Sequence, residues 1–344
     1  MMACRIVMTV AILALAIGPG TDVAAQPTDR ARAARAVIES AGRTLPALSA
    51  AVAQGEGLVW RDAVGWADVT ARRPASTTTS FPVYSLAKIW TGAAAARLAE
   101  RGGLNPSMPV QRWVPTFPES EVPMTPMHLA THRSGIRHYR DEAEATLARH
   151  CGSPRDALPL FEKDPLLFAP GSARSYSSWG FVLLSAILET IADAPFEQVM
   201  QREIFTPANM EHTHPADPTR PKSHQAISVS RGADGSWQPL PPLDLTCKAG
   251  AGGYASTPSD AARFYVPLLK GTFVGPTFRP LLLQQDGTGS VEESGRGLGG
   301  TALVLVKPDT GLVVTLATST GGAHDTLAAA AQQLAAVFAR PPDQ

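Results

Sequence analysis

The sequence predicts an α+β fold, in which both ends of the chain build one antiparallel sheet flanked by helices and a mostly helical region is inserted between them. Each end combines a helix with a β-hairpin pattern, whereas residues from about 85 to 240 hold mostly helical runs broken by Pro and Gly. Because a hairpin must bury one face against another layer, the simplest arrangement joins the two terminal hairpins. We therefore expect a discontinuous α/β sheet domain of residues 26–84 and 241–344, and a helical region of residues 85–240.

Length and composition restrict the classes of protein that fit this arrangement. The 344 residues correspond to about two units of about 150 residues. The 30 basic and 30 acidic residues give a formal net charge of 0, so no global field favours a polyanion and we expect no nucleic-acid partner. A hydrophobic content of 44% excludes collagen-like and wholly disordered chains.

The first 25 residues have the pattern of a secretory signal peptide. Arg5 precedes an apolar run from Ile6 to Ile17, and small residues precede a cleavage position near Ala25, which predicts a periplasmic or secreted protein. The run is shorter than the ~20 residues of a spanning helix, so we expect no stable membrane span. After cleavage only Cys151 and Cys247 remain, either as a disulfide or as two buried thiols.

The N-terminal helix and hairpin follow this segment. Asp29 to Ala41 carries Ala, Val and Ile at helical spacing, which predicts a helix. The apolar runs Leu48 to Ala53 and Leu58 to Trp66 flank Gln54-Gly55-Glu56-Gly57, which predicts two strands and their turn.

The C-terminal end repeats the combination. Thr301 to Val306 and Leu312 to Ala317 are apolar and β-branched, and they flank the turn residues Lys307 to Gly311. A helix from His324 to Phe338 closes the pattern. The stretch from Pro215 to Leu245, with scattered Pro, Ser and Gly, is predicted as a long surface connection.

Ser85-Leu86-Ala87-Lys88 contains the candidate nucleophile. A serine hydroxyl needs a neighbouring base, and a lysine amine serves as one when burial or nearby positive charge keeps it neutral. A spacing of three places Ser85 and Lys88 on one helical face, and a helix beginning near Ser85 offers free N–H groups to an oxyanion. A helix-capping serine beside a solvated lysine is the structural alternative at this spacing.

Several motifs, taken in their order along the chain, resemble the serine β-lactamase and penicillin-binding-protein superfamily, and within it the mitochondrial serine β-lactamase-like branch. The resemblance covers nearly all of the chain after the signal. The motifs are Phe81-Pro82-Val83-Tyr84-Ser85-Leu86-Ala87-Lys88, His128 to Tyr139, Phe168-Ala169-Pro170-Gly171-Ser172, Tyr176-Ser177-Ser178 and Lys248 to Tyr254.

The resemblance implies a fold and an activity. The fold would be β-lactamase/transpeptidase-like, and the activity that of a serine hydrolase working through an acyl-enzyme without a cofactor. Ser85 would attack the carbonyl of a small-molecule or peptide substrate, Lys88 would be the base, and Tyr176 would relay protons. Ser178, third in the tyrosine motif, would contact substrate. Nothing in the resemblance fixes the natural substrate or the oligomeric state.

The third motif of the superfamily departs from the pattern. Where the family has Lys or His on a strand beside the nucleophile, this sequence has Glu293-Ser294-Gly295. Arg296 is the nearest cation, and a small register change would make it the working one. The strand start near Thr301 would supply a backbone N–H to the oxyanion. The missing cation favours an esterase or peptidase-like hydrolase over a true β-lactamase; the alternative is an impaired member that serves as a binding or scaffolding protein.

A metal site is the competing interpretation of the histidines. His128 and His132 have the spacing of zinc ligands on a helix, but Leu129 stands where a general-base glutamate would follow. We expect both to be structural and no metal to be bound. Lys248 is the other candidate for a cation near the site, with an anchoring role as the simpler interpretation.

Overall fold

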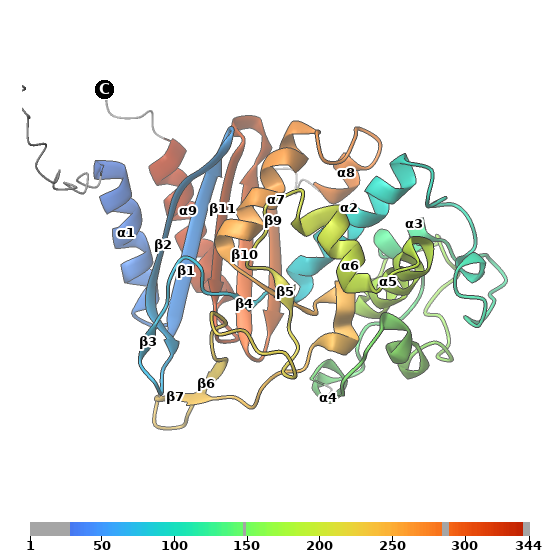
Figure 1. Cartoon of the computed structure of the whole chain (residues 1–344), viewed down its shortest axis with the longest axis horizontal. Coiled ribbons are helices and arrows are strands. Elements are labelled where there is room, and N and C mark those ends of the chain that lie inside the picture. The colour runs from blue at the N-terminus through green and yellow to red at the C-terminus, as the bar shows by residue number, and fades with distance from the viewer. Residues whose placement is uncertain (1–27, 147–148, 284–288, 340–344) are drawn as a thin grey trace, which may run out of the picture.

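The computed structural model describes residues 28–339, except 147–148 and 284–288. The predicted signal peptide lies outside the described residues. The main sheet has six antiparallel strands in the order β3-β2-β1-β11-β10-β9, so strands from the two ends of the chain pair side by side at β1 and β11 (Figure 1). The strands are β1 Ala47–Gln54, β2 Gly57–Asp68, β3 Arg73–Pro74, β9 Val291–Gly297, β10 Gly300–Lys307 and β11 Leu312–Thr318.

Helices cover both faces of this sheet. The first helix, α1 Asp29–Gly42, and the last, α9 His324–Ala339, lie together on one face, and α7 Pro258–Lys270 lies on the other, between the sheet and the helical region (Figure 1). Strands β1, β10 and β11 are therefore buried almost throughout, which explains why their sequences are continuous apolar runs and not alternating ones. The predicted α+β class, both terminal helices and both hairpins are confirmed.

The helical region is irregular around two long buried helices. Both α2 and α5 are apolar on most of their circumference because other elements surround them. Apart from α1, α7 and α9, the helices and helical turns of the described residues, inside and outside this region, are η1 Tyr84–Leu86, α2 Ala87–Glu100, η2 Val110–Arg112, α3 Pro126–Ala130, α4 Glu142–Ala145, η3 Pro154–Leu160, α5 Ser178–Ala192, α6 Phe196–Met200, η4 Gln201–Phe205, η5 Thr246–Ala251, α8 Arg279–Leu282 and η6 Pro308–Thr310.

Small sheets replace part of the predicted surface connection. The stretch from 215 to 245 is mostly exposed or half-buried, as a surface connection would be, but it also contains short strands and buries side chains such as Ala226 and Val229. Buried alanine and valine at isolated positions give no periodic signal, which is why the pattern missed them. The short strands are β4 Phe81–Pro82, β8 Tyr254–Ser256 and β5 His214–Pro215 in one sheet, and β6 Val229–Arg231 with β7 Trp237–Pro239 in another.

Close packing fixes η5 against α2. Gly250 has no room for a side chain, because a Cβ there would stand 2.3 Å from Thr91 Oγ1 and 2.6 Å from Ser185 Oγ. Thr91 Oγ1 also donates to the Gly250 carbonyl at 2.9 Å. This contact brings the carbonyl of the next residue, Ala251, to the first turn of α2.

Candidate active site

Ser85 lies in the turn η1 that leads from β4 into α2. The preceding residue, Tyr84, has φ of 45°, in the left-handed region that non-glycine residues seldom adopt. Its hydroxyl accepts a hydrogen bond from the Gly299 N–H at 3.1 Å, which ties the turn to the β9–β10 hairpin. Strained backbone held by its surroundings is common at functional sites. The turn presents Ser85 at the start of the helix, where N–H groups have no partner within the helix.

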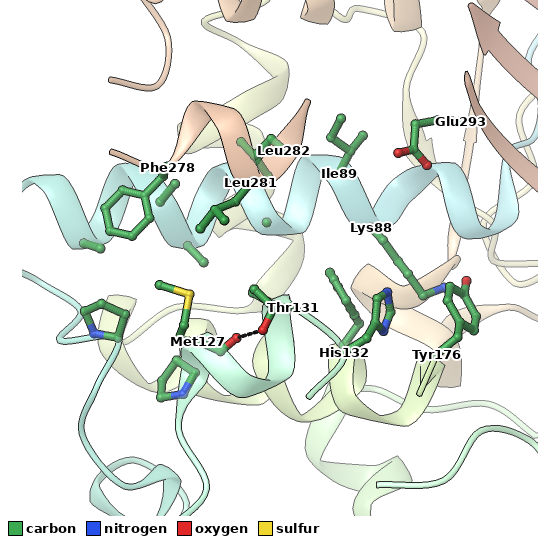
Figure 2. A pocket seen from close by; sticks show the side chains of 18 of the residues that line it. Lys88, Ile89, Met127, Thr131, His132, Tyr176, Phe278, Leu281, Leu282 and Glu293 are labelled. Carbon is green, nitrogen blue, oxygen red and sulfur yellow. Dashed lines mark hydrogen bonds between the residues drawn. The ribbon is translucent and has the colours of Figure 1, made fainter. Parts of the chain in front are cut away.

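The Ser85 hydroxyl contacts both residues that the sequence paired with it. Lys88 Nζ donates to Ser85 Oγ at 3.1 Å, and Tyr176 Oη donates to the same oxygen at 2.7 Å. Lys88 Nζ also donates to the Ala251 carbonyl at 2.5 Å and lies 4.9 Å from the centre of the Tyr176 ring. In Figure 2 the Lys88 amine and the Tyr176 hydroxyl point to the same end of the cavity. The three side chains therefore form one hydrogen-bonded cluster.

The protonation states of the cluster follow from burial. Lys88 is only 6% exposed, and this burial lowers its pKa from 10.5 to about 7, although the Glu293 carboxylate partly offsets the shift. Tyr176 as a whole is 42% exposed, yet desolvation of its hydroxyl raises its pKa above the ordinary value of 10.0, and the hydrogen bonds with Ser85 and Ser178 only partly oppose the shift. Near neutral pH the neutral amine of Lys88 is therefore well populated, while Tyr176 is the phenol. Lys88 is accordingly the stronger candidate for the base.

Two histidines hold the tyrosine in place. The His132 ring lies 4.6 Å from the Tyr176 ring, and His132 Nδ1 accepts from the Ser177 N–H at 3.1 Å. His138 packs edge-on against the same ring at 5.1 Å. Burial, and then the Lys88 charge, lower the pKa values of His132 and His138 to about 3 and about 4. Both are neutral near pH 7, so they position the phenol without adding charge.

The edge strand β9 closes the other side of Ser85. Gly295 lies against η1, where a Cβ would stand 1.7 Å from the Val83 carbonyl oxygen, so only glycine permits this approach. Gly297 and Gly300 close a two-residue hairpin and pair with each other. Because alternate residues of an antiparallel strand bond to the neighbour, Arg296, one residue before this pair, directs its N–H away from β10. That N–H lies on the free edge of the sheet, which faces η1.

A comparison with family models is consistent with this geometry. A model described as Beta-lactamase matches residues 33–338. The chain belongs to the beta-lactamase family.

Individual relatives have several activities in their names. The human mitochondrial serine beta-lactamase-like protein LACTB is 27% identical over 290 residues, which cover 63% of this chain and 52% of that protein. Esterase EstB of Burkholderia gladioli is 32% identical over 184 residues, covering 49% of this chain and 46% of the esterase. The chain spans about half the length of the curated relatives it matches.

A solved structure gives the same fold. The crystal structure of a penicillin-binding protein from Bacillus halodurans superposes with a TM-score of 0.75 at 25% identity, covering 86% of this chain and 97% of the other. The predicted β-lactamase/transpeptidase-like fold is confirmed.

Two predicted site residues of this family member do not take their expected places. The β9–β10 register is regular from Val291 to Gly300, so the register change that would put Arg296 in the position of Glu293 does not occur. Thr301 is fully buried in the interior strand β10, and its hydroxyl donates to the Thr320 carbonyl. The Gly299 N–H beside it is bonded to Tyr84. The two-residue hairpin turn puts β10 behind β9, and that geometry was not visible in the sequence.

Two cavities meet at Ser85. One, of about 280 Å³, is lined by Lys88, Tyr176 and Glu293, and the other, of about 480 Å³, by Ser178, Lys248 and Arg296 among others. Ser178 and Arg296 line the second of these cavities together with Ser85, and not the first.

Lys248 and Arg174 bring further positive charge to the site. The Lys248 ammonium lies 5.5 Å from the ring centres of both Tyr84 and Tyr139, and burial with the nearby Lys88 lowers its pKa to about 8. Arg174 lines the first cavity together with Glu293, whose pKa is raised by burial, although the charges of Arg174 and Lys88 partly oppose the shift. Sequence reasoning missed Arg174, because no motif position marks it.

The structure does not give His128 and His132 the shared helical face that their spacing suggested. His132 lies beyond the end of α3 with φ of 58°, so it does not share a helical face with His128. Among the described residues, no group of three His, Cys, Asp or Glu side chains could hold a metal ion.

Cys151 and Cys247 form a disulfide, which decides between the two alternatives that the sequence left open. The bridge links the segment before η3 to η5, which carries both Lys248 and the Ala251 carbonyl. A cross-link between residues 96 apart in sequence stabilises the fold, in the chain-entropy model, by about 4–5 kcal/mol.

Within the described part of the chain, no single helix has the length and apolar character needed to cross a membrane. One bent pair, α5 with the following Phe196–Phe205 segment, meets those limits only when its two parts are taken together across an 82° bend.

Proposed function

We propose that this protein is an exported serine hydrolase that cleaves ester or peptide-type carbonyl substrates through an acyl-enzyme on Ser85. One observation carries the proposal: the Ser85 hydroxyl is within hydrogen-bond distance of both a buried lysine of lowered pKa and a phenol. A serine that only capped the helix would need neither neighbour. The membership of the beta-lactamase family and an esterase among the relatives support the same reaction class.

In the proposed reaction Ser85 Oγ forms a bond to the substrate carbonyl carbon while neutral Lys88 takes the hydroxyl proton. The negative carbonyl oxygen of the tetrahedral intermediate accepts hydrogen bonds from the Ser85 N–H and from the Arg296 N–H, which points away from β10. The Arg296 N–H thus replaces the donor that we expected near Thr301. The proton then passes from Lys88 through the Tyr176 hydroxyl to the leaving group as its bond to carbon breaks. Water enters by the reverse sequence and releases the acid.

Glu293 carries the preference for an ester or peptide over a β-lactam. It lines the first cavity on the strand position that faces Lys88 and Tyr176. A carboxylate here repels a substrate carboxylate at short range, and burial strengthens the repulsion because the local dielectric is low. Neutral substrates are therefore favoured over anionic penicillins.

Active-site labelling tests the proposal directly. The protein without residues 1–25 is treated with a fluorophosphonate and, in parallel, with a labelled penicillin. After digestion, the masses of the peptides are measured by mass spectrometry. We expect a fluorophosphonate adduct on the Ser85 peptide, no adduct in Ser85→Ala, and slower labelling by penicillin. Absence of any adduct with both probes would overturn the hydrolase and leave the binding or scaffolding role. Export is checked separately, by the N-terminal sequence of the protein recovered from periplasm or medium.

A further inference from the structure

The first cavity extends far beyond the reacting groups. It runs along one face of α2, whose residues at the cavity recur every three or four positions from Lys88 to Ala99, a distance of about 16 Å at 1.5 Å per residue. Figure 2 shows Glu293, Lys88 and Tyr176 at one end and Phe278 toward the other, with Met127 facing α2 across the space. Ser85 therefore lies at one end of an elongated cavity, with Lys88, Tyr176 and Glu293, and we call this end the mouth.

The walls beyond the mouth are apolar. Small residues on α2 leave the space open, and larger aliphatic side chains from α3 and α8 close it. Thr131 lies midway along the cavity, and its hydroxyl is engaged within the protein, because it donates to the Met127 carbonyl at 2.6 Å (Figure 2). Water in this part of the cavity would find few partners for its hydrogen bonds. An alkyl chain is the better occupant. The residues concerned are Gly92, Ala95, Ala96 and Ala99, with Met127 and Leu281.

The reacting groups are divided between the two cavities. Tyr176, the proposed donor to the leaving group, lines the first cavity, whereas Ser178 and Arg296 line the second. A proton donor must lie within hydrogen-bond distance of the atom it protonates. The leaving group is therefore on the side of the first cavity, and the acyl group is on the side of the second.

We propose that the substrate is a neutral ester whose alcohol portion carries a long unbranched alkyl chain, held in the cavity along α2 while Ser85 takes the acyl group. This inference rests on the proposed function. Ser85 Oγ bonds to the acyl carbon, the bond from that carbon to the alkoxy oxygen breaks, and the long-chain alcohol leaves with the proton from Tyr176. Water then releases the acid. Glu293 at the mouth admits the neutral ester and disfavours an anionic one.

Chain-length kinetics test the assignment of the two halves. One series varies the alcohol (ethyl, butyl, hexyl and octyl acetate), and the other varies the acid (ethyl acetate, butyrate, hexanoate and octanoate). We expect kcat/KM to rise about fourfold for each CH2 group that enters the cavity in the alcohol series, and to change little in the acid series. A rise in the acid series alone, or in neither, would overturn the inference.

Substitutions in the cavity test where the alkyl chain of the substrate binds. Ala99→Phe fills the far end of the cavity, and we expect it to lower the octyl-to-ethyl ratio of kcat/KM about tenfold. Ala328→Phe is the matched control, since Ala328 is likewise half-buried on a helix but lies in α9, against the opposite face of the sheet. An octyl-to-ethyl ratio in Ala99→Phe equal to that of Ala328→Phe would contradict the proposal.

A second measurement needs no variant. Octanol should inhibit hydrolysis of ethyl acetate competitively and much more tightly than butanol, and equal inhibition by the two alcohols would count against the cavity. The two proposals fail differently. A parent enzyme that cleaves no ester and gives no adduct on Ser85 with either the fluorophosphonate or the penicillin overturns the hydrolase and this inference with it. Cleavage of short acetates without dependence on alcohol length overturns this inference alone.

Discussion

The helical region and the sheet both border Ser85, but they contribute different chemical groups. The helical region supplies side chains: Lys88 from α2 and Tyr176 from the segment before α5. The sheet supplies backbone: Gly295 packs main chain against main chain, and Arg296 offers its N–H from the edge of β9. For the groups that contact Ser85, side-chain identity should therefore matter on the helical side and backbone position on the sheet side, while Glu293 of β9 acts through its charge. Four substitutions separate these cases.

The largest effect is expected for Lys88→Met, which removes the proposed base. We expect kcat/KM to fall by about 10⁴, at the upper end of what general bases contribute. Lys88 has a pKa of about 7 in the fold and 10.5 when exposed, so between these values the unfolded chain binds more protons and the stability of the parent rises with pH. Below pH 7 the variant should therefore be more stable than the parent, by up to about 5 kcal/mol. Ester hydrolysis and thermal unfolding at pH 6 and pH 9 measure both effects, and a destabilised variant at pH 6 would contradict them.

Gly295→Ala should be the most damaging change on the sheet side. The added methyl group would stand 1.7 Å from the Val83 carbonyl, so β9 must move away from η1 and the oxyanion loses a donor. We expect kcat to fall by about 10², comparable to removal of one oxyanion donor. Gly57→Ala is the control, since nothing lies within 4 Å of a Cβ there. Equal kcat in the two variants would refute the backbone role of β9.

Glu293→Gln should change the pH dependence. The Glu293 carboxylate raises the pKa of Lys88, and its removal should lower that pKa further. The acidic limb of kcat/KM against pH, which rises through about 7 in the parent as Lys88 loses its proton, should then shift to lower pH. The same variant should be labelled faster by penicillin. An unshifted limb would mean that Glu293 does not act on the base.

The smallest effect is expected for Arg296→Ala. The Arg296 side chain is exposed, and its guanidinium donates a hydrogen bond to Ser294 Oγ. The variant loses this side chain but keeps the backbone N–H. We expect hydrolysis of neutral esters to stay within about twofold. Arg296→Pro, which has no N–H, is the informative counterpart, and equal rates for the two would contradict the use of the Arg296 N–H.

The sequence specified the two sides of the site unequally. Ser85 and Lys88 could be paired from residue type and spacing, and Tyr176 from the resemblance of its motif to the family, because each would act through its side chain. The backbone donor was assigned to the strand near Thr301, whereas we propose the N–H of Arg296, because an N–H has no residue type and its direction depends on strand register. The helices and hairpins of the two ends were predictable from apolar patterning, whereas β4, β8 and β5 are too short to show any period.

The disulfide between Cys151 and Cys247 also has a topological consequence. It closes a covalent loop that contains Tyr176 and excludes Ser85. A protease that cuts once in the exposed stretches between the two cysteines, such as the turn near Gly235, produces two chains that remain joined. The segment that carries Tyr176 then stays covalently attached to η5, whose Ala251 carbonyl accepts a hydrogen bond from Lys88. Activity should survive such a cut under oxidising conditions and decline only when a reductant is added.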